Sequence, residues 1–155
     1  MTASILPTIL LVEDSVDDYK ATERSFRKNN FRNPLQWCKS GQDALDYLKH
    51  EGPYAPSSPS SAKDTPALIL LDLNMPGLDG KQTLASVKKD ERLRKIPVVI
   101  LTTSTDERDV EQCYSLGAST YIQKPVDFDG LIEAIKRLKE YWFGIAVLPR
   151  ENDNA

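Results

Sequence analysis

The sequence predicts a doubly wound α/β fold, in which helices cover both faces of a five-stranded parallel sheet. Short apolar runs alternate with segments of helical period along 155 residues, a length that suits one domain. Three of these runs are rich in Ile, Leu and Val and too short for helices: residues 8–13, 67–72 and 98–102. Such continuous runs are typical of strands buried on both faces. Their alternation with helices indicates parallel pairing through right-handed crossovers.

The remaining elements are predicted from weaker patterns. Two further strands are expected at residues 35–38 and 119–123. Asp127 suits the N-cap of the last helix, and Gly117 suits the end of a helix that runs from about residue 107 to 116. The apolar residues at helical spacing are Val16, Tyr19 and Phe26; Ala44, Leu45 and Leu48; Leu84 and Val87; and Leu131, Ile132, Ile135 and Leu138.

Composition excludes several classes of protein. The net charge of −3 lacks the basic footprint that non-specific nucleic-acid binding requires. No apolar run approaches the roughly 20 residues of a membrane helix. The two cysteines, Cys38 and Cys113, have a spacing that matches neither a disulfide scaffold nor a metal site. The sequence therefore predicts a reduced, cytoplasmic protein that binds neither nucleic acid nor membrane.

A single domain is expected to occupy residues 1–155, with its core at about 8–142 and an extension at 143–155. This division leaves no residues for a DNA-binding or catalytic output domain. Residues 52–65 are rich in Pro and Ser and are interpreted as an exposed loop. The polar end, residues 151–155, is expected to be disordered.

Acidic residues follow two of the predicted strands. Glu13 and Asp14 come after the first apolar run, and Asp72 closes the third. In open α/β sheets, ligands bind beyond the carboxyl ends of the strands, near the point where strand order reverses. Three carboxylates meeting there would repel one another, and a hard cation such as Mg²⁺ relieves that repulsion. We expect Asp14 and Asp72 to bind Mg²⁺ directly and Glu13 to bind it through a water.

Other residues at strand ends complete a candidate phosphoryl site. Thr102 offers a hydroxyl at the end of the fourth strand, and Lys124 offers an ammonium at the end of the fifth. A backbone carbonyl in the turn after Asp72, assigned to Asn74, is expected to complete the protein ligands of the metal. Asp carboxylates act as covalent nucleophiles in phosphoryl transfer, and a metal with a lysine stabilises charge on the arriving group.

Together these residues resemble the receiver domain of response regulators in two-component signalling. The matching stretches are LLVEDS at residues 10–15, LILLDLNMPGLDG at 68–80, VVILTTS at 98–104 and GASTYIQKP at 117–125. The resemblance implies the flavodoxin-like strand order 2-1-3-4-5. It implies that a histidine kinase phosphorylates Asp72, with Mg²⁺ at the acidic residues and with Thr102 and Lys124 at the phosphoryl group. It also makes Tyr121 the switch aromatic.

The end of the chain resembles a narrower group, the cyanobacterial phytochrome-associated response regulators (the Rcp group). The similarity lies in the sequence EYWF at residues 140–143 and in LPR at 148–150. It implies a phytochrome kinase as donor and a homodimer through the fourth helix, fifth strand, fifth helix and tail. Exposed aromatic clusters often mark protein contacts, so we expect an interface here rather than a tail folded onto its own domain. The expected interface residues are Tyr141, Trp142, Phe143 and Leu148.

Three other functions fit part of the pattern. A haloacid-dehalogenase-like phosphatase usually has a second acid two residues after its nucleophile, and that position holds Asn74. A flavodoxin-like cofactor-binding protein needs a phosphate loop after the first strand, where Glu13 and Asp14 would repel phosphate. A degenerate receiver, acting as a constitutive binding module, would have no need of Asp72, Thr102 and Lys124.

Overall fold

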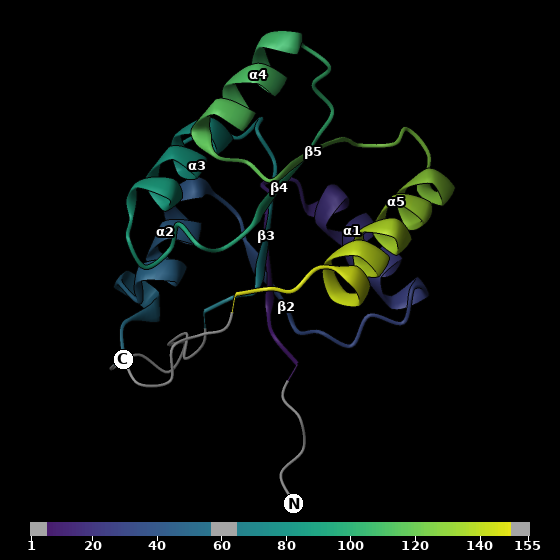
Figure 1. Cartoon of the computed structure of the whole chain (residues 1–155), viewed down its shortest axis with the longest axis horizontal. Helices are drawn as coiled ribbons and strands as arrows, with labels where there is room; N and C mark the ends of the chain where they lie inside the picture. Colours follow the sequence, from purple (N-terminus) through teal and green to yellow (C-terminus); the bar gives the residue numbers. More distant parts are fainter. Residues whose placement is uncertain (1–5, 57–64, 150–155) are drawn as a thin grey trace, which may run out of the picture.

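A computed structural model describes residues 6–56 and 65–149. It shows one five-stranded parallel sheet with the order β2-β1-β3-β4-β5, as predicted (Figure 1). The centre of the 52–65 loop and the polar end at 151–155 lie outside the described residues. The strands are β1 (Ile9–Val12), β2 (Leu35–Cys38), β3 (Leu68–Leu71), β4 (Val98–Thr102) and β5 (Thr120–Gln123).

Five α-helices cover the sheet in two layers. Helices α1 and α5 pack together on one face, and α2, α3 and α4 lie on the other (Figure 1). None of the helices in the described part of the chain combines the length and apolarity needed to cross a membrane. The helices are α1 (Val16–Lys28), α2 (Gly41–Lys49), α3 (Gly80–Lys89), α4 (Glu107–Leu116) and α5 (Phe128–Glu140).

The central strands are buried because both of their faces meet a helical layer. Along β1, Leu10 and Val12 join the core under α2, α3 and α4, whereas Ile9 and Leu11 join the core under α1 and α5. Strands β3 and β4 divide their side chains in the same alternating way. This two-sided burial explains why the strands have continuous apolar sequences.

Helix caps bring the helices close to the carboxyl ends of the strands. Ser15 caps α1 and Asp127 caps α5, each by accepting a hydrogen bond from a backbone N–H of the first turn. Gly117 ends α4 with a φ of 109°, in the left-handed region that favours glycine. A side chain at Gly80 would collide with the backbone of Asp72, so α3 begins directly against the chain that leaves β3. The predictions for Asp127 and Gly117 are confirmed.

The chain beyond α5 forms a π-helical turn, η2 (Tyr141–Ile145), that the sequence did not predict. Trp142 and Phe143 are half-buried and pack against the core under α1 and α5. The ring of Phe143 meets that of Phe31 edge-on, with centroids 5.7 Å apart. These two aromatic residues thus fold back onto their own domain, whereas Tyr141 remains 51% exposed.

Candidate functional site

The three predicted carboxylates lie together at the carboxyl edge of the sheet. Strands β1 and β3 pair in register, with Val12 opposite Leu71, so the next residues, Glu13 and Asp72, emerge side by side. One oxygen from each of Glu13, Asp14 and Asp72 lies within 4.8 Å of the other two. Glu13 is 2% exposed and Asp72 is 7% exposed, whereas Asp14 faces solvent. The sequence prediction of one converging acidic cluster is confirmed.

This donor set fits a hard divalent cation. It consists of oxygens alone, and one exposed member leaves room for the waters that Mg²⁺ retains. Three neighbouring carboxylates also disfavour one another's ionisation, and a divalent cation among them would reduce that cost. We therefore assign the acidic cluster as the residues that would hold the metal.

Lys124 reaches the same cluster from β5. Its ammonium lies 2.5 Å from Glu13 Oε1 and 3.8 Å from Asp72 Oδ2. Its backbone N–H donates to the carbonyl of Thr102 at 2.7 Å, which fixes the lysine at the end of the sheet. The predicted meeting of Lys124 with the acidic residues is confirmed.

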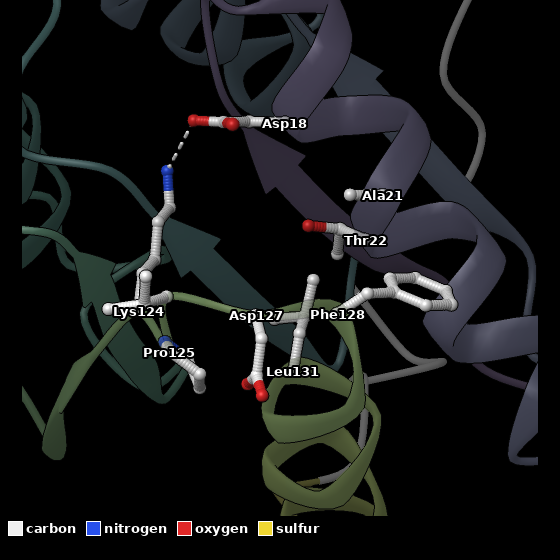
Figure 2. A pocket seen from close by; sticks show the side chains of 9 residues that line it. Asp18, Ala21, Thr22, Lys124, Pro125, Asp127, Phe128 and Leu131 are labelled. Atoms are coloured by element: carbon white, nitrogen blue, oxygen red, sulfur yellow. Dashed lines mark hydrogen bonds and ion pairs between the residues drawn. The ribbon is translucent and has the colours of Figure 1, made fainter.

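Lys124 has a further partner that the sequence analysis missed. Asp18, in the first turn of α1, places Oδ2 at 3.1 Å from the ammonium. Figure 2 shows the two side chains pointing toward one another beside a cavity of about 170 Å³. The sequence carried no signal for this contact, because Asp18 and Lys124 belong to different elements far apart in the chain.

Burial and the contacts between Glu13 and Lys124 shift the pKa of both side chains. Burial disfavours the carboxylate of Glu13 and raises its pKa to about 7, although the hydrogen bond from Lys124 acts in the opposite direction. Burial also disfavours the ammonium of Lys124. Its hydrogen bond to Glu13 and the charge of Asp72 outweigh that effect and raise the pKa of Lys124 above its ordinary value. These contacts therefore favour the charged form of Lys124 in the site.

Thr102 is buried at the end of β4 and links the site to the surface. Its Oγ1 accepts from the side-chain amide of Asn74 and from the backbone N–H of Ser104, both at 3.4 Å. The hydroxyl of Tyr121 donates to the carbonyl of Ser104 at 3.0 Å. Tyr121 thus contacts the loop that begins at Thr102. A role for the Asn74 carbonyl as a metal ligand stays a prediction.

The loop after β4 is tied to both neighbouring helices. Ser104 donates its hydroxyl to Asp109 of α4, and Lys81 of α3 forms an ion pair with the same carboxylate at 2.5 Å. These contacts lower the pKa of Asp109, the hydrogen bond from Lys81 being the largest cause. The sequence carried no signal for this link, since its partners come from different elements.

Trp37 supports the acidic turn from β2 and was also missed. Its indole N–H donates to the carbonyl of Glu13 at 2.7 Å, and its ring stacks on Tyr19 with centroids 3.9 Å apart. The bond holds the backbone at the point where β1 leads into Asp14. The predicted interface residues Tyr141, Trp142, Phe143 and Leu148 lie beyond α5 and take no part in the acidic cluster.

Comparisons with known sequences identify the family. The model of the response regulator receiver domain matches residues 9–136. "Probable methanogenesis regulatory protein FilR2" of Methanothrix harundinacea is 40% identical over 137 residues, which cover 88% of this chain and 83% of that protein. Response regulator Rcp1 of Synechocystis is 36% identical over 141 residues, which cover 91% of this chain and 92% of Rcp1.

Solved structures agree with the sequence matches. The crystal structure of the phosphorylated cyanobacterial phytochrome response regulator RcpA has a TM-score of 0.85 and 35% identity, covering 94% of this chain and 99% of RcpA. The Mn²⁺-bound form of Rcp1 has a TM-score of 0.82 and 35% identity, covering 93% of this chain and 99% of that one. With its strand order and its site geometry, the chain therefore belongs to the response regulator receiver family and is of the Rcp1 type.

Proposed function

We propose that this chain is a phosphorylation switch in which Asp72 accepts a phosphoryl group from the phosphohistidine of a histidine kinase. The observation that carries the proposal is the cluster of Glu13, Asp14 and Asp72 with the Lys124 ammonium beside it. We assign Mg²⁺ to Asp14, Asp72 and the carbonyl of Asn74, with Glu13 acting through a water. The Mn²⁺-bound form of Rcp1 supports a divalent cation at a site of this family.

In the proposed reaction, a carboxylate oxygen of Asp72 attacks phosphorus. The P–N bond of the phosphohistidine breaks, and its electron pair returns to the imidazole. The metal supplies positive charge for the phosphoryl oxygens when it is bound. Lys124 supplies a second positive charge from the β5 side, and Thr102 supplies a hydroxyl that donates to a phosphoryl oxygen.

The added phosphoryl group would change the protein surface through Thr102. Phosphorylation adds about −1.5 to −2 charge, which favours the conformation in which Lys124 and Thr102 bind it best. Movement of Thr102 would reach Tyr121 through Ser104, because both contact that residue. A coupling of about 1–3 kcal/mol is typical of such switches. The output would be a change in partner binding or in self-association.

The proposed kinase partner is a phytochrome, because RcpA is named a cyanobacterial phytochrome response regulator and covers nearly the whole chain. The test is phosphoryl transfer from a phytochrome kinase prepared separately under red and far-red light. We expect transfer to Asp72 at rates that depend on the light. Equal rates of transfer from the red-light and far-red-light kinase preparations, or transfer only from unrelated kinases, would contradict this assignment.

We also propose a homodimer through α4, β5, α5 and the segment after α5. Tyr141 and Val147 support it, since their side chains are 51% and 96% exposed. Leu148 is half-buried and would contribute at the edge. We expect the protein to act in the cytoplasm, where the kinase domains of such systems lie.

Geometry does not favour a phosphatase. Two residues after Asp72 stands Asn74, whose amide hydrogen-bonds to Thr102 and cannot serve as a general acid. The Lys124 ammonium also lies 3.8 Å from Asp72 Oδ2, a proximity that a degenerate receiver would not require.

The direct test is incubation with acetyl phosphate and Mg²⁺, followed by intact-mass measurement. We expect one phosphate adduct on the wild type and none on Asp72→Asn. Chelation of Mg²⁺ before the donor is added should prevent formation of the adduct, because the repulsion among three carboxylates would then oppose an anionic donor. An adduct of equal yield on Asp72→Asn would contradict the proposal.

A further inference from the structure

Three carboxylates surround one ammonium at the site. Lys124 lies 2.5 Å from Glu13, 3.1 Å from Asp18 and 3.8 Å from Asp72. The first two distances are hydrogen bonds and the third is not. The lysine is therefore held by Glu13 and Asp18 at a distance from Asp72, the residue on which the phosphoryl group would arrive.

The two hydrogen-bonding partners of Lys124 differ in how freely they can leave. The Glu13 side chain is 3% exposed, so loss of its cation would leave a buried charge unpaired. The Asp18 side chain is 48% exposed and would exchange the ammonium for water at small cost. The cavity that Asp18 and Lys124 help to line leaves space for the Asp18 carboxylate to turn away (Figure 2). The Asp18–Lys124 contact should therefore break more easily than the Glu13–Lys124 contact.

We propose that Asp18 is a positioning residue that restrains Lys124 and slows capture of the phosphoryl group. This inference rests on the proposed function of Asp72. Two effects of Asp18 act in the same direction. Its carboxylate competes with the phosphoryl oxygens for the ammonium, and its negative charge repels an anionic donor that approaches Asp72.

The neighbouring residue Asp17 offers a matched control. It lies in the same first turn of α1 and carries the same charge, but it is not among the described partners of Lys124. Asp17→Asn and Asp18→Asn thus change the net charge and the helix end alike, and only Asp18→Asn removes a contact to Lys124. Asp18→Glu keeps a carboxylate within reach of the ammonium and serves as the conservative variant.

The experiment measures the rate of phosphorylation of the full chain by acetyl phosphate at saturating Mg²⁺. Asp18→Asn should react about two- to fivefold faster than the wild type, the effect expected from releasing an exposed ion pair. Asp17→Asn should react more slowly than Asp18→Asn and stay closer to the wild-type rate, and Asp18→Glu should return close to the wild-type rate. Equal rates for Asp17→Asn and Asp18→Asn, or a slower Asp18→Asn, would overturn the inference.

A second readout is Mg²⁺ binding, measured by titration calorimetry without any phosphodonor. Asp17→Asn and Asp18→Asn should have matching Mg²⁺ dissociation constants, because neither carboxylate belongs to the acidic cluster. A change in Mg²⁺ affinity confined to Asp18→Asn would assign the residue to the metal site and overturn the inference. Absence of any adduct on the wild type would instead refute the proposed function, and the restraint with it.

Discussion

Burial in the fold and metal binding favour opposite protonation states of Glu13. Burial favours its protonated form and raises its pKa to about 7, whereas a cation in the acidic cluster requires the carboxylate. Lys124 and Trp37 hold the residue in place through its side chain and its carbonyl, respectively. Without metal, the site therefore favours a proton on Glu13, and a bound cation would favour its release.

This conflict predicts a pH dependence of stability. Without metal, the folded protein holds a proton on Glu13 that the unfolded chain releases above its ordinary pKa of about 4.5. The free energy of unfolding should thus rise as pH falls from 8 toward 5, by about 1–3 kcal/mol. Urea unfolding measured with a chelator should show this pH dependence of the free energy of unfolding in the wild type and not in Glu13→Gln.

Saturating Mg²⁺ should make the free energy of unfolding rise with pH instead, because a metal in the acidic cluster favours the deprotonated carboxylate of Glu13. The Mg²⁺ dissociation constant should then fall as pH rises from 6 to 8. A wild-type slope equal to that of Glu13→Gln, with and without metal, would show that Glu13 keeps its ordinary pKa.

Substitution of Lys124 should separate metal binding from phosphorylation. Lys124→Ala removes the ammonium and leaves the three carboxylates in place, so Mg²⁺ should still bind. Phosphorylation by acetyl phosphate should slow by about tenfold or more, because one positive charge at the phosphoryl oxygens is lost. Lys136→Ala, on the exposed face of α5, is the matched control. Loss of Mg²⁺ binding in Lys124→Ala alone would contradict the assigned role.

At the scale of elements, the sequence predicted the sheet well because each central strand is buried on both faces. The apolar runs ending at Glu13 and Asp72 therefore marked both the strands and the site. Asp18, Trp37 and Ser104 were missed, because their functional contacts depend on how α1, β2 and the β4–α4 loop pack around the site. A local pattern carries no information about such contacts.

The turn η2 shows where an apolar pattern is ambiguous. The same aromatic residues suit an interface or an intramolecular contact, and only packing decides between them. Phe143 meets Phe31, so it stabilises the packing of η2 against the segment that follows α1. Tyr141 is exposed and remains available to a second molecule.

Substitutions in η2 should therefore have separable effects. Phe143→Ala should lower the free energy of unfolding by about 1–3 kcal/mol, since it removes a half-buried aromatic contact. Tyr141→Ala should cost less than about 1 kcal/mol and weaken self-association. Urea unfolding measures the first effect, and sedimentation velocity measures the second. A Tyr141→Ala protein with an unchanged dimer, or a wild type that stays monomeric at high concentration, would exclude Tyr141 from an interface.

On the scale of the whole molecule, the site is made by topology. Glu13, Asp72 and Lys124 directly follow three parallel strands, and Thr102 ends the fourth, so these residues lie at one edge of the sheet although they span most of the sequence. The loop after Thr102 then connects that edge to α3 and α4 through Asp109. A charge added at Asp72 would therefore act close to the loop that contacts α3 and α4, whose surface would change in response.

The central claim is that the phosphoryl group is carried covalently by the carboxylate of Asp72. An acyl phosphate is reduced by borohydride to an alcohol, which converts the modified aspartate to homoserine. After reaction with acetyl phosphate and Mg²⁺, peptide mapping of the reduced protein should place homoserine at position 72. Homoserine at position 14 instead, or a phosphate adduct that resists reduction and maps to a histidine or serine, would contradict the account.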